Sequence, residues 1–150
     1  MSASGAGAIR LRVCGVAVRD GQLLTVQHEK DGRRYHMLPG GGVDPGDRLA
    51  ASLAREFVEE LGVEAVPGRL LMACDTIAPD RSRHIVHLVF AVELKGEPRA
   101  TNVDARVVGP AWIPLAQLGD VEFYPDITGW LACACAEAQT GAPVLEPEWK

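Results

Sequence analysis

The sequence predicts an α+β domain in which a mixed β-sheet lies between helices. Runs rich in Val, Leu and Ile stand near the start of the chain and again beyond residue 68, and they have the length of strands. Between them, residues 49–61 repeat apolar side chains at helical spacing, and a second helical stretch closes the chain. Strands, a helix, more strands and a closing helix are typical of such a layered domain.

The first strands are predicted on either side of two turn signals. Residues 11–18 alternate two apolar sets, which suits a strand covered on both faces. Asp20–Gly21 is a hairpin signal that joins this strand to another over 23–27. A second signal, Asp31–Gly32, precedes a short strand over 35–38.

The central helix is predicted over residues 49–61 because every fourth residue is apolar. These residues are Leu49, Leu53, Phe57 and Leu61. Gly62 supplies a left-handed stop, and Asp47 is expected at the N-cap or in the first turn.

Later elements are predicted from β-branched runs and from Gly and Pro punctuation. In order, they are strands over 68–76 and 84–94, a long connection over 99–109, a short strand over 111–113, a helical turn over 115–118 and a helix over 127–140. We expect residues 1–8 to be a flexible tail, 9–140 the domain and 141–150 an irregular tail.

Composition fits one globular domain and excludes some partners. The chain has 150 residues, of which 47% are apolar and 23% charged, and this length can bury a sizeable core. A net charge of −5 argues against binding to a nucleic acid polymer, whose phosphates need a basic surface. The sequence has neither a signal-peptide pattern nor an apolar stretch of about 18 residues. We therefore expect no membrane contact and a cytoplasmic location.

Three carboxylates share one turn of the central helix. Glu56, Glu59 and Glu60 stand at i, i+3 and i+4, where like charges repel. Mg²⁺ prefers carboxylate oxygens and would relieve that repulsion, and the glycines at 40–42 let backbone approach a phosphate at the helix start. These features predict metal-assisted attack of water on a phosphoanhydride. A solvated helix face is the alternative for charged residues of this kind.

The same stretch resembles the Nudix box, G-x5-E-x7-R-E-U-x-E-E-x-G-U, in which U is a bulky apolar residue. The matching residues are Gly41, Arg55, Glu56, Phe57, Glu59, Glu60, Gly62 and Val63. Asp47 departs from the pattern, because the box has Glu there. Residues 38–41 and 112–118 are also similar to what many MutT-like members of the Nudix hydrolase superfamily show. The resemblance implies the Nudix fold, an α/β/α sandwich with a mixed sheet.

The resemblance also implies a metal site and an ion pair. The implied ligands of Mg²⁺, or of Mn²⁺, are the backbone carbonyl of Gly40 and the carboxylates of Glu56, Glu59 and Glu60. One of these carboxylates would act on the attacking water. In the family, the Glu at the position of Asp47 orients the arginine that matches Arg55, so an Arg55–Asp47 ion pair is expected here. Asp is one methylene shorter than Glu, so it keeps the charge and loses reach.

Further candidates lie around the box. The backbone of Gly40 and Gly41 and the side chains of Arg33 and Arg34 are candidates for contact with substrate phosphates; arginines exposed on a hairpin are the alternative for the latter pair. Asp104 is a candidate additional acid or a turn former. Other side chains could contact a base or phosphate, or simply pack: His36, His84, His87, Phe123 and Tyr124.

As an enzyme of this kind, the chain would cleave the pyrophosphate bond of a nucleoside diphosphate derivative. A nucleoside triphosphate, ADP-ribose and a nucleotide sugar all stay open as substrates. Two other classes stay open as well: a Nudix-fold module that binds a nucleotide without cleaving it, and a Mg²⁺-binding or structural α+β domain. The resemblance also allows a homodimer, which is the commonest oligomer.

Overall fold

The computed structural model describes residues 7–102, 104–134, 142 and 144–149. Its strands are β1 Ile9–Val16, β2 Val18–Arg19, β3 Gln22–Lys30, β4 Arg33–Met37, β5 Gly40–Gly42, β6 Glu64–Ile77, β7 His84–Lys95, β8 Val107–Pro114 and β9 Val144–Leu145. Its helices are α1 Leu49–Leu61, the 3-10 helix η1 Leu115–Asp120 and α2 Thr128–Ala134.

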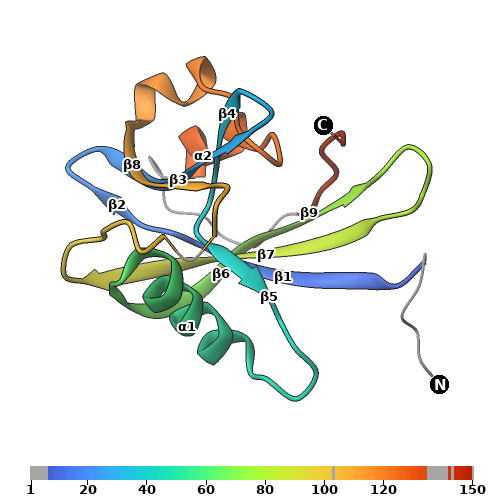
Figure 1. Cartoon of the computed structure of the whole chain (residues 1–150), viewed down its shortest axis with the longest axis horizontal. Helices are drawn as coiled ribbons and strands as arrows, with labels where there is room; N and C mark the ends of the chain where they lie inside the picture. Colours follow the sequence, from blue (N-terminus) through green and yellow to red (C-terminus); the bar gives the residue numbers. More distant parts are fainter. Residues whose placement is uncertain (1–6, 103, 135–141, 143, 150) are drawn as a thin grey trace.

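The strands form two sheets. One has the order β5-β1-β7-β6-β9, and the other joins β2, β3 and β4, with β8 paired to β3. β1 runs parallel to β7 and β9 parallel to β6, whereas β5 and β6 are antiparallel to β1 and β7 respectively. Figure 1 shows α1 on one side of the long strands and η1 with α2 on the other. This mixed sheet between helices confirms the predicted α/β/α sandwich.

Neighbouring residues of β1 face two different cores. Val13 packs in the core under α1 and Cys14 in the core under α2, and their exposed fractions are 0% and 4%. The prediction of a strand covered on both faces is therefore confirmed. The strand ends at Val16 rather than at residue 18, because the chain crosses at Ala17 to the second sheet, where β2 pairs with β3.

Helix α1 spans the predicted residues. Gly62 adopts φ 58° and its N–H donates to the Val58 carbonyl at 3.0 Å, which is the expected left-handed end. The start of the helix differs from the prediction, because Arg48 is the N-cap residue and no side chain caps the helix. The backbone N–H of Asp47 donates to the Asp44 carbonyl at 3.0 Å and closes a turn. The carboxylate of Asp47 does not cap the helix.

Two strands begin earlier than predicted. β6 begins at Glu64 rather than at residue 68, although its register against β7 is irregular just after Pro67. β8 begins at Val107 rather than at residue 111, since its pairing with β3 continues through Gly109 and Pro110. Gly and Pro are depleted in strands, so only the partner strands could reveal these extensions.

The C-terminal part of the chain differs from the prediction. Val144–Leu145 pair in parallel with residues 73–74, so the tail predicted to be irregular contains a short strand. The free edge of β6 explains this, because its unpaired backbone groups can accept another strand. α2 is described to Ala134, and the rest of the helix predicted over 127–140 lies outside the described residues. Within the described ranges, no helix is long and apolar enough to cross a membrane.

Candidate active site

The glycines of β5 bring backbone into contact with a carboxylate of α1. A Cβ atom on Gly41 would lie 2.4 Å from Cδ of Glu56, so this side chain packs directly on the glycine. A Cβ atom on Gly40 would lie 2.0 Å from the Val13 carbonyl oxygen, because β5 pairs with β1 at this point. Gly40 therefore requires glycine because it meets backbone, whereas a side chain at Gly41 would displace the Glu56 carboxylate. Strand β5 thus lies against the middle of α1.

Two carboxylates of α1 are partly buried. Burial is the main cause that raises the pKa of Glu60 to about 7, and the nearby charges of Glu56 and Asp104 contribute to this rise. Burial and then the Glu59 charge raise the pKa of Glu56. The Oε1 atom of Glu60 is buried and has no hydrogen-bond partner among the described residues. A hard divalent cation takes such carboxylate oxygens as ligands, so the donor set fits one.

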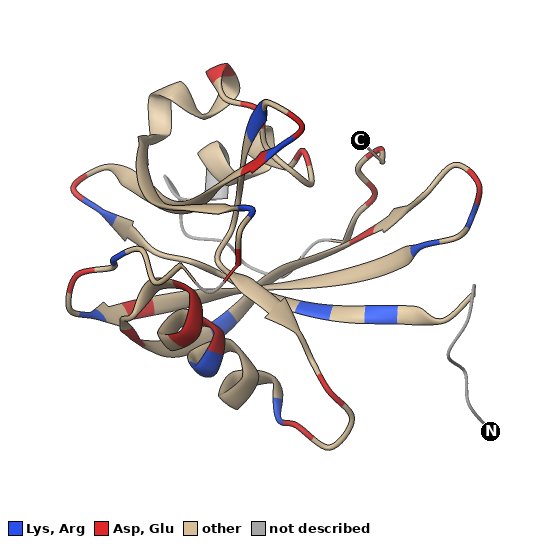
Figure 2. Ribbon diagram, in the orientation of Figure 1, with Lys and Arg blue, Asp and Glu red and all other residues tan. Residues whose placement is uncertain are grey.

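The third carboxylate is oriented differently. Glu59 is 54% exposed, and its Oε1 atom lies 3.8 Å from Nε of Arg55. In the part of the chain that the structure describes, no three Asp, Glu, His or Cys side chains converge as a complete metal site. Figure 2 shows the acidic residues gathered along α1. Glu56 and Glu60 are therefore the partly buried carboxylates of this helix face, and Glu59 is exposed to solvent.

The ion pair predicted from the sequence is present. Nη1 of Arg55 donates to Oδ2 of Asp47 at 3.1 Å. The hydrogen bond that Arg55 donates to Asp47 is the main cause that raises the pKa of Arg55. The pair ties the turn before α1 to the middle of the helix despite the shorter acid.

A cleft of about 760 Å³ is lined by Arg12 and Asp104, whose charges act on Glu60, although none of the three α1 carboxylates lines it. Among the described residues that line it, five are Lys or Arg and three are Asp or Glu: Arg12, Lys30, Arg33, Arg83 and Arg106 against Asp31, Asp104 and Glu122. Rings also line it, from His28, Tyr35, His87, Phe123, Tyr124 and Trp149. This cleft is locally positive in a chain of net charge −5, and it combines cations for phosphates with rings for a base.

Arg12 connects the carboxylates with the cleft, and the sequence reasoning missed it. Its Nη2 atom donates to the Leu38 carbonyl at 3.2 Å, and its charge lowers the pKa of Glu60, Glu56 and His87. It pairs with Gly42 on one side and with His87 on the other. The available signal was an arginine inside an otherwise apolar strand.

The connection before β8 is fixed to the end of α1. Thr101 Oγ1 lies 2.6 Å from the Glu59 carbonyl and 3.1 Å from the Glu60 carbonyl, and its hydroxyl donates to these groups in the last turn of the helix. Asp104 then lines the cleft near Glu60. Its Oδ1 also accepts the Arg106 N–H at 2.9 Å. Asp104 is therefore a turn former that also faces the cleft.

The two hairpin arginines have separate surroundings. Arg33 lines the cleft and pairs with Glu122. Arg34 pairs with Glu29 at 2.9 Å and is not among the residues that line the cleft. Arg33 thus lies at the cleft with its charge paired to Glu122, whereas Arg34 is paired on the surface away from the cleft.

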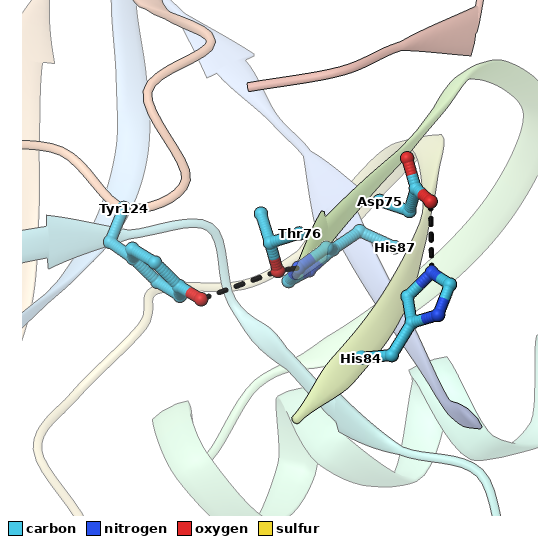
Figure 3. A network of polar contacts seen from close by, with 5 residues as sticks. All are labelled: Asp75, Thr76, His84, His87 and Tyr124. Carbon is cyan, nitrogen blue, oxygen red and sulfur yellow. Dashed lines mark hydrogen bonds and ion pairs between the residues drawn. The ribbon is translucent and has the colours of Figure 1, made fainter. Parts of the chain in front are cut away.

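The candidate histidines also separate. His36 is held by Thr25 at 2.9 Å, and His84 by Asp75 at 2.9 Å, and neither lines the cleft. His87 does line it, together with Tyr124. Its Nε2 atom lies 3.2 Å from Oγ1 of Thr76, and burial lowers its pKa to about 4. Figure 3 shows this contact and the Tyr124 hydroxyl group, which lies 3.3 Å from the same Oγ1 atom.

Known proteins share this fold and this box. The sequence pattern of the NUDIX domain matches residues 9–131. A Mycobacterium tuberculosis protein named "Putative 8-oxo-dGTP diphosphatase 2" is 36% identical over 127 residues, which cover 80% of this chain and 84% of that protein. A MutT NUDIX hydrolase from Burkholderia pseudomallei is 30% identical, with a TM-score of 0.62 over 73% of this chain and 85% of its own.

A third comparison supports the fold alone. The solution structure of the E. coli ORF135 protein has a TM-score of 0.71 at 22% identity, over 87% of this chain and 95% of its own. Nudix hydrolases generally act with a divalent metal ion and on nucleotide-linked substrates. With the family pattern matched over most of its length, the chain belongs to the NUDIX family and is a Nudix-type pyrophosphohydrolase.

Proposed function

We propose that the chain is a Mg²⁺-dependent hydrolase that cleaves a phosphoanhydride bond of a nucleoside triphosphate. The observation that carries the proposal is the Oε1 atom of Glu60, which is buried and has no hydrogen-bond partner among the residues that the structure describes. An unpaired carboxylate in such a place is costly, by several kcal/mol when it is ionised. A cation bound to this oxygen removes the cost of the unpaired charge, and this gain in free energy favours metal binding.

Mg²⁺ would be held by the partly buried carboxylates of Glu56 and Glu60, joined by Glu59 and by the backbone carbonyl of Gly40. The contact of Glu59 with Arg55 is long, at 3.8 Å, and exposed, so it holds that carboxylate weakly. When bound, the ion offsets phosphate charge and lowers the pKa of a coordinated water. Mn²⁺ has similar ligand preferences and would serve as a substitute.

The protein's own residues orient the reactants. The glycines of β5 allow the backbone to approach Glu56 closely, and the Arg55–Asp47 pair fixes the turn against the helix. Arg12 and Arg33 lie in the cleft beside these groups and would pair with phosphate oxygens. We assign the additional acidic position at the cleft to Asp104. Arg34 is not proposed to contact the substrate.

A nucleoside triphosphate is preferred over ADP-ribose because of the relatives. The protein that is 36% identical is named for diphosphatase activity on 8-oxo-dGTP, whereas the likeness to an ADP-ribose pyrophosphatase of Streptococcus suis is 16% identical and supports only the fold. The cleft's rings provide a surface for one base.

The proposal is tested by incubating the protein with dGTP, dATP, ADP-ribose and a nucleotide sugar in Mg²⁺, and separating the products by chromatography. We expect the deoxynucleoside triphosphates to yield monophosphate and pyrophosphate, and this activity to stop in excess EDTA. Turnover that persists in EDTA would remove the metal from the proposal. If ADP-ribose or the nucleotide sugar is hydrolysed and the triphosphates are not, the proposed substrate class is wrong.

A further inference from the structure

The cleft has a neutral polar floor that the proposed catalytic groups leave unused. Its members come from three elements: Thr76 from β6, His87 from β7 and Tyr124 from the segment after η1. Thr76 is 0% exposed, and its Oγ1 atom contacts both His87 Nε2 at 3.2 Å and the Tyr124 hydroxyl at 3.3 Å. In Figure 3 the three side chains form a continuous row. His87 and Tyr124 line the cleft, whereas Thr76 lies behind them.

The partners of His87 determine which ring nitrogen carries its proton. The ring is neutral at ordinary pH, since burial lowers its pKa to about 4, so it has one donor and one acceptor. Its Nδ1 atom is buried without a partner among the described residues. A buried N–H without a partner is rarer and more costly than a bare lone pair. The hydrogen therefore belongs on Nε2, where it donates to Thr76.

The direction of the next bond follows. Thr76 accepts from His87, and within the described residues its hydroxyl contacts only one other group, the oxygen of Tyr124. Thr76 therefore donates to Tyr124, and the phenol's own hydrogen is left for the cleft. The separation of 3.3 Å is longer than the roughly 2.8 Å of a strong O–H···O bond. Burial raises the pKa of Tyr124, so it remains a neutral donor.

We infer that Tyr124 is a specificity-determining residue that donates a hydrogen bond to a carbonyl oxygen of the substrate base, and that Thr76 and His87 are positioning residues that fix the direction of this bond. The inference rests on the proposed function. Guanine presents a carbonyl acceptor where adenine presents an amino donor. A hydrogen-bond donor on the floor of the cleft therefore selects dGTP over dATP. Trp149, whose ring meets that of Tyr124 edge to face at 5.9 Å, forms the neighbouring wall.

A second threonine–histidine pair provides a matched control. Thr25 Oγ1 lies 2.9 Å from Nδ1 of His36, and it also contacts the Ala111 carbonyl at 3.1 Å. Thr25 is 0% exposed, as Thr76 is, but neither Thr25 nor His36 lines the cleft. Thr25→Val and Thr76→Val each remove a buried hydroxyl beside a histidine. Only the second change touches the proposed row.

The test measures kcat and KM for dGTP and for dATP in Mg²⁺. We expect the wild type to favour dGTP by at least about tenfold in kcat/KM, the size of one well-placed hydrogen bond. Tyr124→Phe and Thr76→Val should bring the two values within about twofold, mainly through the KM for dGTP. Thr76→Ser restores the hydroxyl and should keep the preference, as should Thr25→Val. Melting curves for each variant confirm folding.

Several results would overturn the inference. These are a preference that survives both Tyr124→Phe and Thr76→Val, an equal loss of preference in Thr25→Val, or a wild type that favours dATP. If the wild type hydrolyses neither triphosphate, the proposed function fails, and calorimetric binding of GMP and AMP decides the inference separately. Tighter binding of GMP that Tyr124→Phe abolishes would uphold it, and equal or absent binding of both would overturn it.

Discussion

The carboxylate face of α1 and the floor of the cleft are built in opposite ways. Glu56 and Glu60 are neighbours on one helix, and Gly41, on which Glu56 packs, comes from the same short stretch of sequence. Thr76, His87 and Tyr124 come from three separate elements, and Thr76 and Tyr124 are 48 positions apart in the sequence. The face carries charges that a metal can use, whereas the floor is neutral and directional. The carboxylates proposed for the chemical step are thus close together in the sequence, whereas the residues proposed to select the base are brought together by the tertiary structure.

The same physical cause acts on both regions with opposite sign. Burial disfavours the charged form, so it raises the pKa of Glu60 to about 7 and lowers that of His87 to about 4. Each side chain is therefore neutral in the folded chain over a pH range in which it would be ionised in the unfolded chain. The face must be charged to hold a cation, whereas the floor works only while it is neutral.

The largest expected effect comes from removing charge on the face. Glu56→Gln and Glu60→Gln should each lower turnover at least about a hundredfold, roughly 2.7 kcal/mol of transition-state stabilisation. Gln keeps the size of Glu and removes the charge that holds the ion. Pyrophosphate release from dGTP in saturating Mg²⁺ measures this loss of turnover. Glu64→Gln, an exposed residue just beyond the box, is the matched control and should be silent. Near wild-type turnover in the Glu56 and Glu60 variants would refute the metal site.

Stability against pH should separate the two regions by sign. The folded chain keeps the proton of Glu60 between about pH 4.5 and 7, so this group lowers stability as pH rises. The folded chain keeps His87 unprotonated between about pH 4 and 6.5, so this group lowers stability as pH falls. The slope of either contribution is at most about 1.4 kcal/mol per pH unit.

Urea unfolding in EDTA at pH 5 and pH 6.5 tests these signs. The stability of Glu60→Gln minus that of wild type should increase with pH, and the stability of His87→Gln minus that of wild type should decrease. Two differences of the same sign, or two flat ones, would show that burial does not hold both groups neutral.

The smallest expected effect concerns Asp47. Asp47→Glu should leave turnover unchanged or raise it modestly, because the longer side chain keeps the pair with Arg55 and restores the family's reach. The pair is exposed, so stability should change by less than about 1 kcal/mol. Turnover and melting temperature measure both effects. A loss of activity beyond about tenfold would mean that the turn is built around the shorter acid.

The contrast between the regions also explains what sequence reasoning could reach. The bounds of α1, the turn at Gly62 and the Arg55–Asp47 pair follow from periodicity and spacing within one stretch, and the structure has all of them. Arg12 was missed because its role depends on β5 and β7 lying on either side of β1. The row behind Tyr124 depends on strand register, which no local pattern encodes.

One competition assay tests the division between the two regions most directly. An equimolar mixture of dGTP and dATP with Mg²⁺ is given to wild type, Glu60→Gln and Thr76→Val, and the two monophosphates are quantified. We predict that Glu60→Gln lowers both products by the same factor and keeps their ratio. With both triphosphates at saturating concentration, Thr76→Val should keep most of the total product and move the ratio of the two monophosphates toward one. A changed ratio in Glu60→Gln, or a uniform loss of both products in Thr76→Val, would contradict the assignment of chemistry to the face and selection to the floor.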